Sequence, residues 1–371
     1  MKYISISSAL FALLLLISDG GWATPTHIVV LGDSLSDTGN LYTLTGGLLP
    51  PRPKADPASE SLYDSGRTPK RFSNGDVWTD YVANSRGLTV NSVWTGNPAD
   101  PIDLRGNGYV DNFAVANSFT GSYDWVGSPV YGPISNWTDL VNVSVLNQPF
   151  FGFPGLRQQA DAYIAKGVST DALHIIWAGA NDLFFAPELT PLTAPNVVQQ
   201  AVANIQGVLQ DLHAQGVSKF VVANLPDLGA TPFAHGETSL PISLLDNSAA
   251  LSSAADAFNQ LLAQMLNSLS FNVTMVDIGS LSKLLFTDPQ MFGFTNATDP
   301  CLDLTTLASA CSDQNKYIFW DEVHPTTTAH GIIAQAFNAA IPEPATNQLL
   351  ILGMLGMLLI AGKGAVRICA G

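Results

Sequence analysis

Charged residues are scarce in this sequence of 371 residues, because only 12% are Asp, Glu, Lys or Arg. The 15 Lys and Arg residues face 30 Asp and Glu residues, and no basic cluster occurs. Nucleic-acid binding needs such a cluster, so we expect no nucleic-acid partner. Hydrophobic residues make up 47% of the chain, which excludes a disordered protein and provides enough apolar surface for a large core.

Cysteine is also rare, with three residues in the whole chain. Cys301 and Cys311 enclose nine residues, and in an exported protein we expect them to form a disulfide. Cys369 lies near the C-terminus and is expected to be lost or unpaired. No Cys-x-x-Cys motif or suitably spaced histidine accompanies these cysteines, so we expect no metal and no cofactor.

Long apolar runs are confined to the two ends of the chain. Lys2 precedes an apolar stretch over residues 4–17, and the small residues Gly21 and Ala23 follow it. This order is typical of a secretory signal peptide, so we predict cleavage after Ala23 and export of the protein. A buried N-terminal strand or helix would not require a cationic start followed by a small-residue exit.

Residues 341–371 form the second such end. Pro342-Glu343-Pro344 precedes an uncharged run of 14 residues, 349–362, which Lys363 and Arg367 follow. The run is shorter than the ~20 residues of a permanent membrane span, and it lacks the polar face of an amphipathic core helix. The region resembles the PEP-CTERM sorting tail of Gram-negative bacteria. That resemblance implies transient membrane contact through a short hydrophobic helix, an exosortase-type processing enzyme as partner, and a final location in the cell envelope, cell surface or extracellular matrix.

Residues 24–340 are predicted to form one α/β domain. Helical spacing of apolar residues covers residues 198–212 and 251–269. Apolar runs rich in β-branched residues predict strands at residues 27–31, 173–178, 220–225 and 273–278, with a weaker one at 112–116. Continuous apolar strands between amphipathic helices indicate a parallel sheet covered on both faces. Eight aromatic residues lie within residues 118–153, and they either line a substrate pocket or pack beneath a long loop.

A candidate nucleophile follows the first predicted strand. Residues 32–40 read Gly-Asp-Ser-Leu-Ser-Asp-Thr-Gly-Asn, which places Ser34 at the carboxyl end of that strand. Open α/β sheets have their ligand sites at this edge. A small-residue turn there can expose a hydroxyl and direct backbone N–H groups at an oxyanion.

A candidate base lies near the other end of the domain. His324 follows Asp321 by three residues, a spacing that lets the carboxylate orient the imidazole while its other nitrogen faces a serine. Taken alone, the pair also fits an N-capping aspartate beside a surface histidine. A metal site formed with Glu322 and His330 is disfavoured, because the spacing does not make these side chains converge.

No Gly-x-Ser-x-Gly elbow occurs, so the plan is not that of an α/β-hydrolase. From about residue 27 to residue 340 the chain instead resembles a GDSL lipase/esterase of the SGNH hydrolase superfamily. The matching blocks are residues 32–40, 71–75, 77–78, 179–182, 224–229, 231–232 and 321–325. The resemblance implies a flavodoxin-like three-layer αβα sandwich with about five parallel strands. It also implies that Ser34 is the nucleophile, His324 the base, Asp321 its orienting partner, and the Asn181 side chain an oxyanion donor.

One block departs from the family pattern. Asn117 stands where we align a glycine whose N–H binds the oxyanion, so the expected oxyanion hole comprises the Ser34 and Asn117 N–H groups and the Asn181 amide. Asparagine is among the non-glycine residues that best tolerate positive φ, which favours retention of the backbone donor.

The expected function is that of an exported serine esterase or lipase acting on small-molecule or lipid esters through an acyl-enzyme. The same machinery also suits a polysaccharide deacetylase or a thioesterase. A catalytically weak surface-binding protein is the remaining alternative.

Overall fold

The computed structural model describes residues 24–56, 58–97, 100–121, 154–185, 194–239 and 246–341. Residues Thr26–Ala340 form one compact unit. The predicted signal peptide, the hydrophobic run of the predicted sorting tail and most of the aromatic segment 118–153 lie outside the described residues. Within the described ranges, no helix has both the length and the apolar character needed to cross a membrane.

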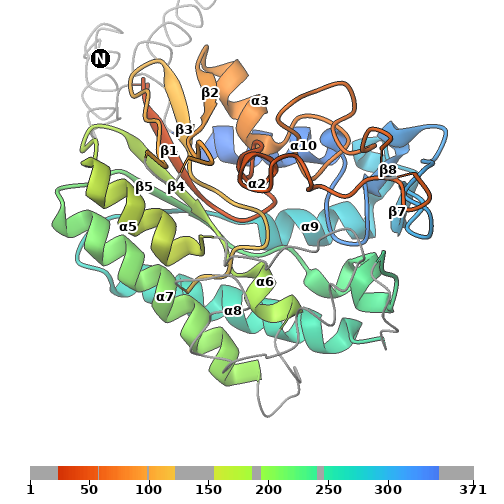
Figure 1. Cartoon of the computed structure of the whole chain (residues 1–371). Coiled ribbons are helices and arrows are strands. Elements are labelled where there is room, and N and C mark those ends of the chain that lie inside the picture. Colours follow the sequence, from red (N-terminus) through yellow and green to blue (C-terminus); the bar gives the residue numbers. More distant parts are fainter. Residues whose placement is uncertain are drawn as a thin grey trace, which may run out of the picture. The chain divides into compact units, whose positions relative to one another are not determined.

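A parallel sheet of six strands forms the centre of the unit, in the order β2-β3-β1-β4-β5-β6 (Figure 1). Its strands are β1 (Ile28–Gly32), β2 (Thr89–Ser92), β3 (Tyr109–Asn112), β4 (Leu173–Trp177), β5 (Phe220–Ala223) and β6 (Thr274–Val276). The predicted α/β class is therefore confirmed, with six strands in place of about five.

Two strands differ from the sequence prediction, and both lie on the same side of β1. β3 ends at Asn112, where the predicted strand 112–116 begins, and the apolar residues 113–116 form the buried loop that follows. β2 was not predicted, because its Thr-Val-Asn-Ser sequence is polar and only half-buried. Both strands pair in parallel, β3 with β1 and β2 with β3.

Helices cover both faces of the sheet (Figure 1). They are α2 (Asn40–Leu44), α3 (Trp78–Ser85), α5 (Leu156–Lys166), α6 (Ala180–Phe184), α7 (Ala194–Ala214), α8 (Ser248–Ser268), α9 (Ile278–Thr287) and α10 (Thr327–Ala340). α5, α7 and α8 pack together on one face, and α3 packs against α10 on the other. The helices predicted at 198–212 and 251–269 are confirmed as α7 and α8.

Shorter elements complete the unit. They are the 3-10 helices η1 (Leu228–Ala230), η2 (Pro232–His235), η3 (Pro289–Phe292) and η4 (Gln314–Lys316), and the strands β7 (Asn296–Pro300) and β8 (Tyr317–Phe319). β7 and β8 pair in parallel as a separate two-stranded sheet. A disulfide joins Cys301, directly after β7, to Cys311.

Aromatic side chains join α3 and α10 to the sheet. The Trp78 ring of α3 stacks on Phe337 of α10 with ring centroids 3.8 Å apart, and both rings contact Trp177 of β4. All three side chains are almost completely buried. Since β8 leads through residues 320–326 into α10, this packing fixes the end of the segment that carries His324.

We expect Phe337→Ala to lower the free energy of unfolding by about 3–5 kcal/mol, because it removes a fully buried ring and leaves a cavity. Denaturant unfolding of the purified protein measures the change. Met291→Ala is the matched control, because Met291 is 64% exposed and its truncation should cost less than about 0.5 kcal/mol. Equal effects of the two substitutions would contradict this account of the packing.

Candidate active site

Ser34 lies in a tight turn at the carboxyl end of β1. The N–H groups of Ser36 and Asp37 both donate to the Asp33 carbonyl, and the N–H of Leu35 donates to Asp33 Oδ1 at 3.0 Å. Gly32 makes the turn possible, because a Cβ at this position would lie 2.3 Å from the Trp177 carbonyl oxygen of β4. The backbone therefore forms a tight turn at the predicted edge of the sheet, and the role of Ser34 as nucleophile stays a prediction.

Asp37 ties this turn to the loop after β3. Its carboxylate accepts hydrogen bonds from the N–H groups of Gly39, Asn40, Leu41 and Ala116, at 2.6–3.0 Å. The Asn40 amide donates to the carbonyls of Asn112, the last residue of β3, and Ala114 of the same loop. The last four residues of the 32–40 block therefore place the loop that carries Asn117.

His324 and Asp321 form the predicted pair within one turn of chain. Asp321 Oδ2 lies 2.7 Å from His324 Nδ1, while Asp321 Oδ1 accepts the N–H groups of Val323 and His324 at 2.9 and 2.7 Å. The aspartate thus caps its own turn with one oxygen and orients the imidazole with the other. The His324 side chain is only 12% exposed, so the surface-histidine alternative is wrong.

The candidate oxyanion donors come from three elements. Asn117 has a φ of 65°, in the left-handed region expected for it, and neither its N–H nor that of Ser34 donates to any described residue. Asn181 of α6 donates one amide hydrogen to the Ser118 carbonyl at 2.9 Å. Its neighbour Asp182 accepts the Thr120 N–H and hydroxyl at 3.0 and 2.7 Å. Residues 117–120 are therefore fastened to α6 beside the candidate nucleophile.

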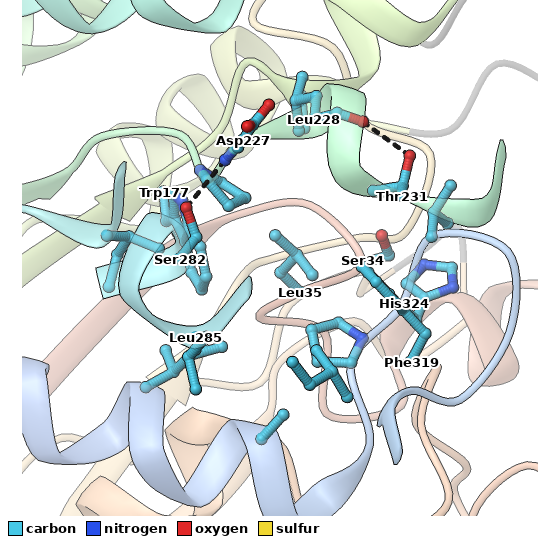
Figure 2. Close-up of a pocket in the computed structure, with 18 of the residues that line it drawn as sticks. Ser34, Leu35, Trp177, Asp227, Leu228, Thr231, Ser282, Leu285, Phe319 and His324 are labelled. Atoms are coloured by element: carbon cyan, nitrogen blue, oxygen red, sulfur yellow. Dashed lines mark hydrogen bonds between the residues drawn. The ribbon is translucent and has the colours of Figure 1, made fainter. Parts of the chain in front are cut away.

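Ser34, Asn181 and His324 line one pocket of about 760 Å³, its open mouth included. Figure 2 shows the Ser34 side chain beside the His324 ring at the pocket wall. The Ser34 hydroxyl makes no hydrogen bond to a described residue, as is common at a site without substrate. The rest of the wall is largely apolar and includes Phe184, Leu281, Leu285, Phe286, Phe319 and Ile333. These residues lie outside the segment 118–153, whose role in the pocket stays a prediction.

Electrostatic coupling between Asp321 and His324 shifts the pKa of both groups. Burial disfavours the charged imidazolium, but the charges of Asp321, Glu322 and Asp33 outweigh it and raise the pKa of His324. Burial would also raise the pKa of Asp321, and the charge and hydrogen bonds of His324 lower it instead. The pair is therefore stable as imidazolium and carboxylate, which is the charge state formed when a histidine takes a serine proton.

Asp33 is a functional candidate that the sequence did not single out. Burial raises its pKa to about 7, and its Oδ2 has no hydrogen-bond partner among the described residues. Asp33 lines the same pocket as Ser34. The one sequence signal for it is its place directly before Ser34, the candidate nucleophile. Among the described residues, no group of His, Cys, Asp and Glu has the geometry of a metal site.

The fold and the site define a class of hydrolytic enzyme in which a serine at the carboxyl edge of a parallel sheet faces an aspartate-oriented histidine. Residues 28–337 match the family described as GDSL-like Lipase/Acylhydrolase. The match covers most of the chain, so the protein belongs to the GDSL lipase/esterase (SGNH hydrolase) family and is a carboxylic ester hydrolase. The predicted family resemblance is confirmed, whereas the sorting tail stays a prediction.

Several known proteins are similar to this chain. The thermolabile hemolysin of Vibrio parahaemolyticus is 25% identical over 327 residues, covering 83% of this chain but only 62% of the hemolysin. A GDSL esterase/lipase of Arabidopsis thaliana is 28% identical over 344 residues, covering 85% of this chain and 88% of the relative. Among solved structures, the acetylxylan esterase Axe2 of Geobacillus stearothermophilus aligns with a TM-score of 0.40 at 14% identity, covering 87% and 96% of the two chains.

The raised pKa of Asp33 predicts a pH dependence of stability. Between pH 3.8, the ordinary aspartate pKa, and about pH 7, the folded protein holds a proton here that the unfolded chain releases. Stability from this group is therefore complete at low pH and is lost as the pH rises through that window. Asp33→Asn keeps the acceptor for Leu35 but cannot ionise, so we expect its Tm to fall less than the wild-type Tm between pH 5 and pH 8. Parallel Tm curves for the two proteins would contradict the prediction.

Proposed function

We propose that the protein is an exported serine esterase that hydrolyses carboxylic esters through Ser34, His324 and Asp321. The observation that carries the proposal is the Asp321–His324 hydrogen bond of 2.7 Å at a pocket that Ser34 and Asn181 also line. Each of these side chains is held by its own element, so the groups are positioned before substrate binds.

The proposed reaction begins when His324 Nε2 takes the Ser34 proton. The Ser34 oxygen attacks the ester carbonyl, and the resulting oxyanion accepts hydrogen bonds from the Ser34 and Asn117 N–H groups and the Asn181 amide. His324 then protonates the leaving alcohol, which yields an acyl-enzyme. Water activated by the same histidine releases the acid.

The pocket walls support an apolar acyl group as the part of the substrate that binds there. α9 contributes Leu281, Leu285 and Phe286, and α10 contributes Ala329 and Ile333 on the wall of the same pocket. A chain of methylene groups gains about 0.8 kcal/mol for each group that it buries against such walls. The geometry therefore favours esters of longer acyl chains over the acetyl esters of polysaccharides.

Export and tail processing belong to the same proposal. The signal-like residues 1–23 and the sorting-tail-like residues 341–371 support it, and a disulfide between Cys301 and Cys311 suits an oxidising compartment. In this proposal the exosortase-type enzyme and the membrane act on the tail, after which the esterase remains at the cell envelope, cell surface or extracellular matrix.

Ser34→Ala is expected to abolish labelling by a fluorophosphonate probe and to lower kcat/KM by about 10³-fold or more, because it removes the attacking oxygen. Ser248→Ala is the control, since the Ser248 hydroxyl donates to Asp246 Oδ1 at the start of α8 and Ser248 does not line the pocket. Probe labelling and ester turnover of the purified protein are the measurements. Equal labelling of wild type and Ser34→Ala would refute the nucleophile assignment. Lack of turnover on every ester, with retained binding to cell-surface polymer, would favour the surface-binding alternative.

The acyl-pocket assignment predicts a chain-length profile. With p-nitrophenyl esters, kcat/KM should rise by about fourfold per added methylene from acetate until the pocket is filled. Leu281→Trp, which narrows the pocket, should shift the preference to shorter chains. Leu284→Trp on the same helix should not, because Leu284 is 43% exposed and does not line the pocket. A maximum at acetate for the wild type would instead favour a deacetylase, and preference for acyl thioesters would favour a thioesterase.

A further inference from the structure

Asp321 has a second side-chain partner, and it comes from a distant part of the chain. The Tyr63 hydroxyl donates to Asp321 Oδ2 at 2.7 Å, and this is the same oxygen that binds His324 Nδ1. The two residues are 258 positions apart, and Tyr63 is only 3% exposed. The proposed reaction steps give no role to the buried Tyr63 hydroxyl, which binds the same Asp321 oxygen as His324.

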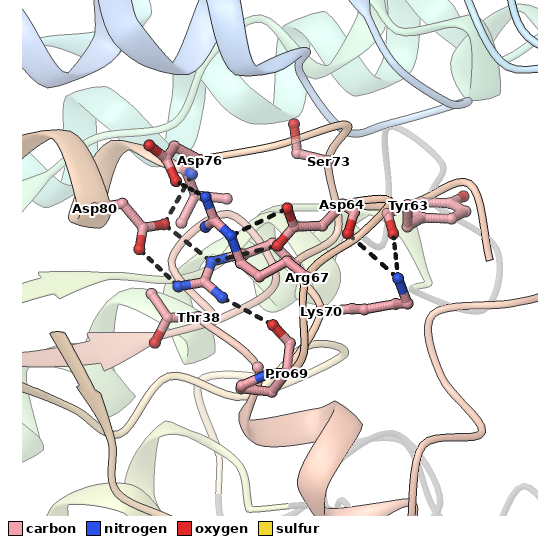
Figure 3. Close-up of polar contacts among 12 residues, drawn as sticks. Thr38, Tyr63, Asp64, Arg67, Pro69, Lys70, Ser73, Asp76 and Asp80 are labelled. Atoms are coloured by element: carbon pink, nitrogen blue, oxygen red, sulfur yellow. Dashed lines mark hydrogen bonds and ion pairs between the residues drawn. The ribbon is translucent and has the colours of Figure 1, made fainter. Parts of the chain in front are cut away.

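A network of charges holds the backbone around Tyr63. Lys70 Nζ donates to the carbonyls of Tyr63 and Asp64, both at 3.3 Å (Figure 3). It also donates to Glu60 Oε1 at 2.7 Å. The ammonium group therefore fastens Tyr63 from the backbone side, while Asp321 receives its hydroxyl. Lys70 is 6% exposed, so this grip on the chain is largely shielded from solvent.

Two arginines form ion pairs in the same segment, and one of them, Arg71, joins it to α3. Arg71 makes a two-pronged contact with Asp80, through Nε at 3.1 Å and Nη2 at 2.7 Å. Arg67 pairs with Asp64 and Asp76. Figure 3 shows Arg67 between Asp64 and Asp76, with Asp80 close by. We call residues 60–76, which precede α3, the ion-paired loop.

The ion-paired loop contacts the histidine as well as the aspartate. The Phe72 ring lies against the His324 imidazole with centroids 5.2 Å apart, and Ser73 Oγ donates to the Pro325 carbonyl at 2.9 Å. Tyr63 itself packs edge-on against Phe72 and Trp320. One loop thus contacts Trp320, Asp321, His324 and Pro325 of the segment 320–325.

We propose that Tyr63 is a positioning residue of the Ser34–His324–Asp321 site, which holds the Asp321 oxygen on the imidazole and neutralises part of its charge, with the ion-paired loop as its support. The inference rests on the proposed function. It adds a second group to Asp321 Oδ2 and a reason for the buried charges of residues 60–80.

The consequence of losing this hydroxyl is electrostatic. His324 faces Asp321, Glu322 and Asp33, which all favour its charged form, and it also lies near His330. A hydrogen bond from Tyr63 weakens the pull of the Asp321 charge on the imidazolium. Without it, the pKa of His324 should rise further. As the pH falls, the neutral imidazole that acts as the base would then become protonated at a higher pH.

The test compares Tyr63→Phe with Tyr81→Phe in the purified protein. The Tyr81 hydroxyl also makes one hydrogen bond, a part-buried one with Thr327 Oγ1 at 2.9 Å, but Tyr81 lies on α3 outside the site. For Tyr63→Phe we expect the acid limb of the kcat/KM profile to move up by about 0.5–1 pH unit and kcat to fall about tenfold, the effect of one lost hydrogen bond to a charged group. Tyr81→Phe should leave both unchanged.

An unchanged acid limb in folded Tyr63→Phe, with kcat within about twofold of wild type, would overturn the proposal. NMR titration of His324 in a Ser34→Ala background gives the same answer without turnover, and it should show the upward shift. A protein that is inactive before substitution would refute the proposed function, whereas this titration still tests Tyr63. If Tyr63→Phe fails to fold, Lys70→Met leaves the phenol in place and should lower kcat by loosening its support. Wild-type kcat in Lys70→Met would then count against the proposal.

Discussion

Buried carboxylates that accept backbone N–H groups hold this site together. Asp37, Asp182 and Asp321 each bind N–H groups of a loop that carries a site residue, and each is almost completely buried. A buried carboxylate without donors would be expensive, so each of them specifies one arrangement of the loop around it. Burial still raises the pKa of Asp182 to about 6, which shows how much of the hydration these donors must replace.

The fold was predictable where burial follows a simple repeat. β1, β4 and β5 are continuous apolar runs, and α7 and α8 show helical spacing, so their positions follow from the sequence pattern. The strand predicted at residues 112–116 was displaced from β3, because the last two residues of β3 are polar yet fully buried. Asp111 bonds His27 and Asn91, and the Asn112 amide donates to the Ser36 carbonyl. A polar residue whose partners come from other strands gives no hydrophobic signal.

The candidate site divides along the same line. Three features of the site were predictable because each depends on a short stretch of sequence. They are the turn at Ser34, the Asp321–His324 pair and the positive φ of Asn117. The Tyr63–Asp321 contact joins residues 258 positions apart, and the sequence around each residue contains no pattern that predicts contact with the other. The block at residues 71–75 matches the family pattern in the sequence, but the sequence does not predict that Phe72 of this block packs against His324.

The ion-paired loop concentrates basic residues in a chain that has few of them. Of 15 basic residues in the chain, Arg67, Lys70 and Arg71 fall within five positions, and the last two are nearly buried. Buried ion pairs repay their desolvation only when the geometry is good, and removing one partner leaves an uncompensated charge. Partial opening of the loop would leave buried charges without partners, so the buried ion pairs favour one conformation of the loop. Such a support suits a site in which a single carboxylate oxygen must serve both a phenol and an imidazole.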